Sequence, residues 1–309
     1  MNTEAADQAL YARKFDGPIV LWMVLIHALA IPAFFMFTWT NFAVFFALYF
    51  LTCCLGITLG YHRLLTHRTM KMSKGWERVF ATFGVLALQG SPLEWVGHHR
   101  MHHAHSDTPD DPHNAREGFW HCHWGWLFVR VQKFDDWGLM TKYARDIARD
   151  PYYRLLENMW VQIAIQVAFG MVLLAIGGLG MVFWGIFFRI VWCYHCTWLV
   201  NSLTHFMGYK TYETGDLARN NWLVGILAWG EGWHNNHHAH QDLAPAGHKW
   251  WEIDVTMWCI RVLEVLGIAY DVKDKIPFQE EVSSDSAESE SNSGISSPIS
   301  IQEPAGLLN

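Results

Sequence analysis

The stretch FAVFFALYFLTCCLGITLGYHRLLTH, from Phe42 to His67, shows how this chain is organised. Its first 20 residues carry no charge, and they lead directly into two histidines, His62 and His67. A helix rises about 1.5 Å per residue, so about 20 apolar residues cross a hydrocarbon core about 30 Å thick. We therefore predict a transmembrane helix over residues 42–61, with both histidines just beyond its end.

Three further segments have a similar length and apolar character. They cover residues 19–37, 159–179 and 181–204. The short link TWTN joins the first two predicted helices and GGLG lies at the junction of the last two, so each pair should form a tight hairpin. The sequence therefore predicts an all-α integral membrane protein with four transmembrane helices in two hairpins.

Basic residues mark one side of this predicted bundle. Arg13 and Lys14 precede the first span, and the residues after the second span include Arg63, Arg68, Lys71, Lys74 and Arg78. The positive-inside rule then places both termini and the long middle segment in the cytoplasm. We expect a short N-terminal segment (1–17) and one main domain (18–278), in which residues 62–158 and 205–278 form a cytoplasmic helical cap.

Composition agrees with a membrane protein. Hydrophobic residues make up 51% of the chain and charged residues only 17%. The net charge of −7 arises largely from the Ser-rich tail, residues 279–309, which has six acids and no Lys or Arg and should be disordered. The rest of the chain is nearly balanced in charge, so nothing indicates a nucleic-acid partner.

Histidines gather at the cytoplasmic ends of the predicted spans. The motif GHHRMHHAHSD follows the second span, NSLTH ends the fourth, and WHNNHH comes shortly after it. An even number of crossings separates these motifs, so all of them can meet in one pocket. The candidate metal-binding residues are His62, His67, His99, His102, His103, Asn201, His205, His234, His237 and His238.

Helix geometry divides these histidines between two adjacent metal ions. Residues four apart, such as His99 and His103, lie about 40° from each other around a helix, whereas His102 leans the other way. By the same spacing, His234 and His238 share one ion and leave His237 for the other. His62 and His67 lie about 140° apart on a regular helix, so the helix should end or bend there. Imidazole suits iron, copper and zinc, and a nitrogen-dominated pair of metals favours oxygen activation over hydrolysis.

Other polar residues in apolar segments have simpler explanations. We expect His27 and His195 to be core residues with satisfied hydrogen bonds, and we expect His121, His123, His240 and His248 to lie at the surface or behind the ligands. Arg189 lies inside the fourth span, where a charge is costly, and is a candidate functional residue without an assigned role. The six cysteines should be reduced.

The combined motifs HRLLTH, HRMHH, HNNHH and WLVNSLTH resemble the membrane-bound fatty-acid desaturases, specifically their Δ9 (stearoyl-type) branch. The resemblance covers roughly residues 15–278. It implies a nonhaem centre of two Fe ions that uses O2 to place a cis double bond in a saturated acyl chain. By matching positions, one iron takes His62, His67, His99, His103 and His237. The other takes His102, His205, His234 and His238, with Asn201 bound through water.

The resemblance also implies a bent, apolar substrate tunnel. Gln89, Trp95, Thr197 and Trp198 should line it, and Phe50 and Cys54 should close its far end. In the related animal enzymes that act on acyl-CoA, an Arg-Asp pair before the second box and a basic pair after GWL grip the coenzyme. Here Gly97 and His98 replace the first pair, and Arg130, a candidate substrate-binding residue, is followed by Val131.

This departure favours the bacterial, cyanobacteria-like branch, which acts on chains esterified in membrane lipids. The sequence has no haem-binding HPGG motif, so we expect a separate electron donor, with ferredoxin favoured over cytochrome b5. The expected location is a bacterial plasma membrane or a thylakoid. The alternatives are an acyl-CoA Δ9 desaturase, a di-iron hydroxylase or ketolase, and, more distantly, a histidine-rich metal transporter.

Overall fold

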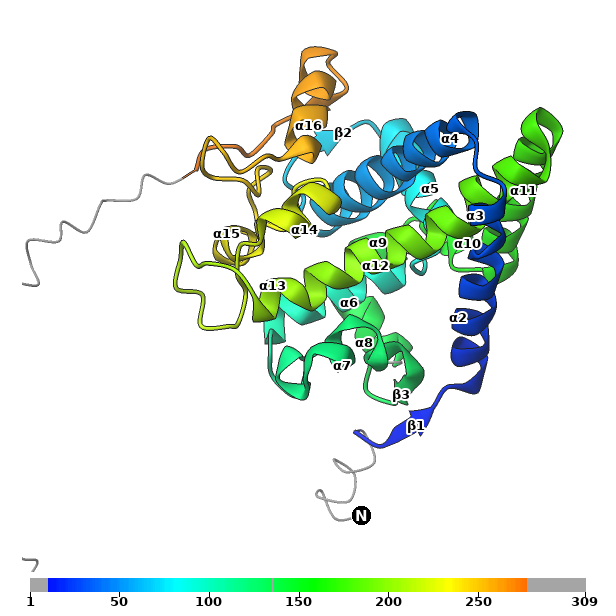
Figure 1. Cartoon of the computed structure of the whole chain (residues 1–309). Helices are drawn as coiled ribbons and strands as arrows, with labels where there is room; N and C mark the ends of the chain where they lie inside the picture. Colours follow the sequence, from blue (N-terminus) through cyan, green and yellow to red (C-terminus); the bar gives the residue numbers. More distant parts are fainter. Residues whose placement is uncertain (1–10, 135, 277–309) are drawn as a thin grey trace, which may run out of the picture. The chain divides into compact units, whose positions relative to one another are not determined.

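The structure, a computed structural model, describes residues 11–134 and 136–276 and is mostly helical (Figure 1). The first part contains β1 Arg13–Phe15, α2 Gly17–Ala30, α3 Pro32–Phe35, α4 Trp39–Tyr49, the π-helix η1 Phe50–Thr66, β2 Lys71–Met72, α5 Lys74–Leu86 and α6 Pro92–His105. Next come the 3-10 helix η2 Ala115–Glu117, α7 Phe119–His123, the 3-10 helix η3 Gly125–Phe128, β3 Val129–Val131, α8 Trp137–Tyr143, α9 Arg145–Ala148 and α10 Pro151–Leu156. The remainder is α11 Met159–Val182, the π-helix η4 Phe183–Phe188, α12 Arg189–Asn201, α13 Leu203–Phe206, α14 Trp222–Leu227, α15 His234–Ala239, α16 Val255–Val265 and β4 Ala269–Tyr270.

Three helical stretches among the described residues are long and apolar enough to cross a membrane. They are Gly17–Phe35, Trp39–Thr66 and Met159–Phe206. The third has 48 residues and contains a break at Gly177 and Gly178, where Gly178 adopts a φ of 70°. The predicted segments 159–179 and 181–204 therefore lie within one long helical stretch, on the two sides of this glycine break.

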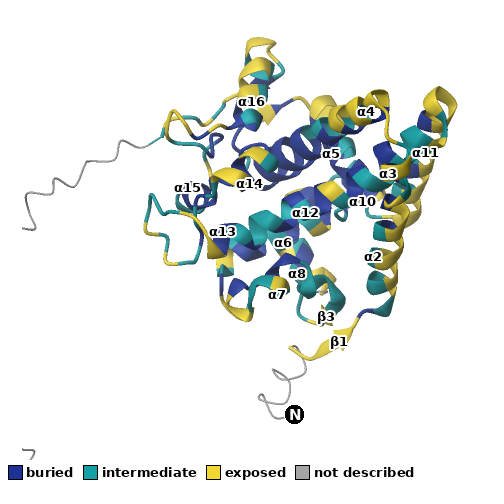
Figure 2. Cartoon of the chain, in the orientation of Figure 1, coloured by how far each residue is buried: buried dark blue, intermediate teal, exposed yellow. Residues whose placement is uncertain are grey.

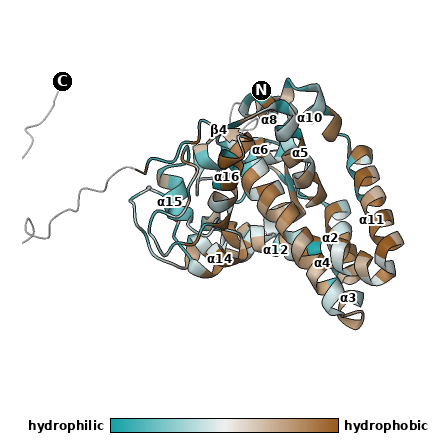
Figure 3. Cartoon of the chain, turned by 90° about the horizontal axis from the view of Figure 1, so that it is seen from above, coloured by the Kyte–Doolittle hydropathy of each residue, from teal (hydrophilic) through white to brown (hydrophobic). Residues whose placement is uncertain are grey.

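The outward faces of these stretches are apolar. Val24 on α2 and Ile176 on α11 are 61% and 69% exposed, and Figures 2 and 3 show exposed, hydrophobic residues along α11. Large exposed apolar surfaces of this kind fit contact with lipid chains. The described part of the chain therefore has the architecture of a membrane protein.

Two small sheets make the all-α prediction wrong in detail. β1 pairs antiparallel with β3, with Lys14 opposite Arg130, and β2 pairs antiparallel with β4, with Lys71 opposite Tyr270. Strands of two or three residues are too short to show an alternating pattern, so periodicity could not reveal them. The first sheet ties the N-terminal segment to strand β3, which carries Arg130.

The π-helix η1 lies at the centre of the packing. It is buried over most of its length and packs against α5 (Figure 2). A Cβ atom added to Gly56 would lie 2.5 Å from the backbone nitrogen of Gly84 on α5, and a Cβ on Gly84 would lie 2.4 Å from the ring of Tyr61. The two helix backbones therefore approach closely, and glycine permits this approach.

Two shorter helices pack against η1. The first is α5, whose apolar run begins at Val79. The second, α16, is amphipathic, and Met257 and Ile260 on its buried face pack against η1 residues such as Leu59. Ile253 precedes this helix and is 44% exposed. The predicted disordered tail, 279–309, lies outside the described residues.

We predict that Gly56→Ala destabilises the protein by about 1–3 kcal/mol, the usual cost of overpacking, because the new methyl group must push η1 away from α5. Gly75→Ala is the matched control, since a Cβ there meets only Ser73 Oγ at 3.9 Å. Thermal unfolding of both variants in detergent measures the difference. A Gly56→Ala variant that unfolds at the wild-type temperature would contradict the close approach.

Candidate metal centre

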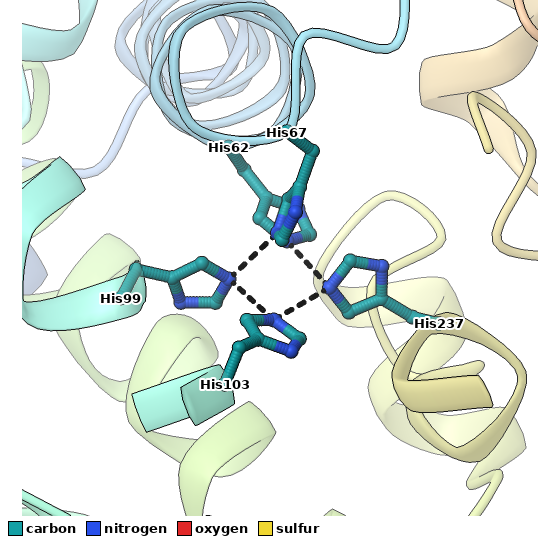
Figure 4. Close-up of side chains that lie close together, drawn as sticks. All are labelled: His62, His67, His99, His103 and His237. Atoms are coloured by element: carbon teal, nitrogen blue, oxygen red, sulfur yellow. Dashed lines mark hydrogen bonds between the residues drawn. The ribbon is translucent and has the colours of Figure 1, made fainter. Parts of the chain in front are cut away.

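Nine histidines from separate parts of the chain bring their ring nitrogens together in two groups. The first, the five-histidine set, contains His62, His67, His99, His103 and His237 (Figure 4); the second, the four-histidine set, contains His102, His205, His234 and His238. Within each set the donor atoms lie within 4.8 Å of one another. These are the two groups that spacing and resemblance predicted, and the structure brings every one of the nine residues into them.

The π-helix explains how the first histidine box converges. The backbone N–H of His67 donates to the carbonyl of His62 at 3.1 Å, which is a bond between residues five apart. Such bonding widens the helix so that residues five apart stack about one turn apart. The helix does end at Thr66, as expected, but its π-type bonding brings the two rings to a centroid distance of 4.8 Å.

The ring nitrogens approach one another closely in both sets. In the five-histidine set, the Nε2 atom of His237 lies 3.0 Å from those of both His62 and His103, and the Nε2 atom of His99 lies 3.2 Å from that of His67. Figure 4 shows these five rings pointing toward a common centre. In the four-histidine set, His205 and His234 are separated by 3.1 Å and His102 and His238 by 3.3 Å, again between Nε2 atoms.

This arrangement fits a bound cation. The Nδ1 atoms of His102 and His238 lie 2.9 and 2.6 Å from the carboxylates of Asp111 and Asp216, to which they donate. Burial lowers the pKa of His238 to about 4, so its Nε2 atom carries a lone pair at neutral pH. Burial also acts to lower the pKa of His102, but the carboxylate of Asp111 outweighs it and raises that pKa above the ordinary value. A metal ion between the two Nε2 atoms can take the place of a proton on His102.

Other histidines of the two sets are also held neutral. Burial, together with the neighbouring imidazoles, lowers the pKa of His67, His99, His103, His234 and His237 well below the ordinary value. Neutral imidazole is the form that coordinates a metal. The local electrostatics therefore prepare these side chains as nitrogen ligands at neutral pH.

Four carboxylates behind the histidines were missed in the sequence. Asp107, Asp111, Asp216 and Glu231 each lie beside the Nδ1 atom of one histidine. Asp107 and Asp111 directly follow the second box and Glu231 precedes the third by three residues, so these acids could have been suspected from their position. Asp216 lies in a connecting segment far from any box, and no local signal marks it.

Asn201 lies at the end of α12 and lines a cavity together with His99. This cavity has a volume of about 680 Å³, within the range of small-molecule sites. Its lining includes the predicted residues Gln89, Trp95, Arg130, Thr197 and Trp198. The cavity thus extends from the five-histidine set along the face of α12.

Phe50 and Cys54 line neither this cavity nor the smaller pocket beside the histidines. Cys54 is buried with its Sγ atom 3.6 Å from Thr256 Oγ1, and Phe50 contacts the ring of Trp229. The smaller pocket is instead lined by η1 residues four or five apart, namely Cys53, Ile57, Thr58 and His62. The resemblance placed Phe50 and Cys54 at the far end of a substrate tunnel; neither of these two cavities reaches them, so that placement stays a prediction.

The isolated histidines have hydrogen-bond partners, as predicted for core residues. His27 and His195 share a contact of 3.1 Å, and His195 in turn lies 3.1 Å from His123. His123 is buried and contacts Ser202 at 2.9 Å, so the surface position considered for it is wrong. Arg189 is fully buried and donates from Nε to the carbonyl of Gly185, and the structure gives it no further role.

His121, His240 and His248 are arranged around other side chains. His121 lies 3.6 Å from a carboxylate oxygen of Glu117, and His240 and His248 both contact the ring of Tyr212. None of the three belongs to either histidine set. This agrees with their expected positions away from the ligands.

Comparison with known proteins agrees with these motifs. Residues 37–254 match the fatty acid desaturase family. The chain is 50% identical to an sn-1 stearoyl-lipid 9-desaturase of Anabaena variabilis, over 77% of this chain and 85% of the relative. It is 44% identical to an sn-2 palmitoyl-lipid 9-desaturase of Nostoc sp. (87% and 96% covered) and 44% identical to an acyl-CoA 5-desaturase of Anemone leveillei (85% and 82% covered). The chain therefore belongs to the fatty acid desaturase family.

Proposed function

We propose that this protein is an oxygen-dependent Δ9 desaturase that introduces a cis double bond into a saturated acyl chain esterified in membrane glycerolipid. The observation that carries this proposal is a cavity of about 680 Å³ that reaches Asn201 and His99 of the five-histidine set, next to which the four-histidine set is buried. The similarity to stearoyl-lipid and palmitoyl-lipid 9-desaturases supports the position of the bond and the lipid carrier.

Iron is the metal that we assign to both sets, because the family is one of di-iron enzymes. The five-histidine set would hold one ion, and the four-histidine set, with Asn201 through water, would hold the other. When bound, the two irons would use O2 and external electrons to oxidise two adjacent methylenes that no side chain can attack. The reaction consumes one O2, two electrons and two protons and releases two waters.

The protein's own residues supply position and exclude water. Trp95 stacks on His99 with a centroid distance of 4.9 Å, and both rings line the cavity. The side-chain amide of Gln89 donates to Thr197 Oγ1 at 2.9 Å, so the amide nitrogen has a partner within the cavity wall. This bond lowers the cost of placing an apolar chain beside that amide nitrogen.

The charges around the cavity favour a lipid carrier over acyl-CoA. Arg13 and Arg130 are the Lys or Arg side chains that line it among the described residues, and they are ion-paired with Glu117 and Asp16, respectively. Asp16, Glu94, Asp111 and Glu117 also line it, so acids outnumber these cations. A polyphosphate carrier needs the opposite balance.

The position of Gly97 supports the same conclusion. A Cβ atom there would lie 2.4 Å from the Sδ atom of Met140 on α8, so a larger residue requires the Met140 side chain to move. Gly97 itself supplies none of the positive charge with which the acyl-CoA enzymes grip the coenzyme. The acyl-CoA desaturase remains the second candidate because one relative of 44% identity bears that name.

We further propose four membrane crossings, with the glycine break separating the last two, and a cytoplasmic location for both termini and the histidine sets. The domain limits 18–278 contain the matched family region. Electrons would come from a separate protein, with ferredoxin favoured over cytochrome b5.

The alternative functions predict different products. A hydroxylase or ketolase would yield an alcohol or ketone in place of an alkene, and a metal transporter would show ion flux in vesicles.

Iron content tests the ligand assignment. The purified protein should hold about two irons per chain, whereas His237→Ala and His205→Ala should each lose iron and activity, because each removes a nitrogen from a set without spare donors. His27→Ala, which lies outside both sets, should retain iron. Elemental analysis with fatty-acid product analysis measures both quantities. Ligand variants with full iron and wild-type turnover would contradict the assignment.

The carrier is tested with labelled substrates in isolated membranes supplied with reduced ferredoxin. With acyl transfer blocked, labelled stearoyl glycerolipid should gain a double bond, whereas labelled stearoyl-CoA should react poorly because the cavity lacks free cations. Each pool is analysed separately for the new alkene. Rapid formation of oleoyl-CoA before any labelled lipid appears would establish the acyl-CoA alternative.

Cysteine labelling in intact bacterial cells tests the topology. Trp39 lies in the link between the first two predicted crossings and Lys275 lies near the end of the cap, and both are exposed. A membrane-impermeant maleimide should label Trp39→Cys in intact cells and Lys275→Cys only after the cells are permeabilised. The reverse pattern would invert the proposed orientation.

A further inference from the structure

The two histidine sets differ in the charges behind their ligands. In the four-histidine set, three of the four Nδ1 atoms face a carboxylate. Asp111 lies 2.9 Å from His102 Nδ1 and Asp216 lies 2.6 Å from His238 Nδ1. Asp107 Oδ1 lies 3.2 Å from His205 Nδ1, although these two atoms are not aligned for a hydrogen bond.

These three carboxylates keep their full negative charge. Backbone N–H groups hold them: those of Asp107 and His113 donate to Asp111, that of Leu217 to Asp107 and that of Ala218 to Asp216. Within the described part of the chain, none of the three forms an ion pair with Lys or Arg. Lys210 and Arg116 are nearby, but they donate to the backbone carbonyls of Asp216 and Asp107.

The carboxylates around the five-histidine set are instead paired with arginines. Only His62 faces a carboxylate, that of Glu231 at 2.6 Å. The guanidinium of Arg63 is shared between two carboxylates, with its Nε and Nη2 atoms 3.1 and 2.9 Å from Glu231 Oε1 and its Nη1 atom 2.9 Å from Asp254 Oδ2. Arg100, a second guanidinium, donates to the carbonyls of Leu65 and Thr66 between the two histidines of the first box and is ion-paired with Asp146. The remaining four histidines show no carboxylate contact in the described structure.

A carboxylate behind a histidine changes the metal in front of it. When Nδ1–H donates to an anion, the imidazole becomes more basic and donates more electron density through Nε2. Nearby negative charge also favours the more positive oxidation state of the ion, and burial strengthens this effect because the local dielectric constant is low. Hydrogen bonding and burial are recognised means by which a protein sets a reduction potential.

We propose that Asp107, Asp111 and Asp216 make the two metal sites unequal, so that iron in the four-histidine set is the harder to reduce and iron in the five-histidine set accepts the first electron from the donor. The three acids act as positioning residues through His205, His102 and His238. Each site takes up one electron and passes from ferric to ferrous iron. The inference rests on the proposed occupancy of both sets by iron.

The wild-type protein tests this directly. Protein loaded with ⁵⁷Fe is titrated with dithionite and redox mediators, and Mössbauer spectra are recorded at each potential. Two ferric signals of equal area should be present, and one should convert to ferrous iron before the other. Two irons that convert together at one potential would overturn the inference and leave the desaturase assignment intact. Fewer than two irons per chain would instead contradict the iron assignment.

Charge-removing variants assign the two signals. Asp216→Asn keeps an acceptor for His238 Nδ1 but removes the charge, so the late-reducing signal should become easier to reduce by at least tenfold in its ferrous-to-ferric ratio at fixed potential, about 59 mV for one electron. Glu231→Gln should move only the early signal. Asp242→Asn removes an exposed acid outside both sets and should move neither.

The variants also give outcomes against the proposal. An Asp216→Asn protein that retains two irons and shows no shift, or a shift of the early signal, would overturn it. If Asp216→Asn loses iron, Asp111→Asn provides the same comparison through His102, and the wild-type titration stands on its own. Iron content measured on the same samples separates a changed potential from a lost ligand.

Discussion

The convergence of nine buried imidazoles is the constraint on which the rest of this structure depends. Lone pairs of neutral imidazoles only about 3 Å apart repel unless a cation lies between them, and four of the nine rings face a carboxylate with their other nitrogen. The groups that hold the rings come from distant segments, including Glu231 before the third box and Asp216 in a connecting loop. The cap loops carry these carboxylates. Their contacts with the rings bring histidine boxes that are far apart in the sequence into one centre.

The helix η1 meets this constraint through an unusual backbone. Its π-type bonding aligns His62 with His67, and the same bonding directs Cys53 toward the small pocket beside the histidines. Close packing of Gly56 against α5 holds the helix in place, and Arg63 links it to Glu231 and to Asp254, which caps α16. One helix thus connects the lipid-facing part of the protein, the first box and the cap.

The cavity and the charges around it convert this centre into a selective site. The wall beside His99 includes Trp95 and the hydrogen-bonded pair Gln89 and Thr197. Farther along, Arg13 and Arg130 are paired with carboxylates of the same lining, so no excess of positive charge collects there. The balance of charge around the cavity, more than any single contact, favours an acyl chain esterified in a lipid over an acyl chain attached to a carrier with several phosphates.

The sequence alone determined the apolar segments, the nine histidines and their division into two sets, because hydrophobic length and residue spacing along a helix are local properties. Tertiary structure alone decided which face of η1 lines the smaller pocket, because π-type bonding sets which residues of this helix align; Cys53 lines that pocket and Cys54 faces Thr256. It also decided that Asp216 lies behind His238 and that β1 pairs with β3. These contacts join residues more than 20 positions apart, and no local pattern in the sequence indicates a partner that only folding brings near.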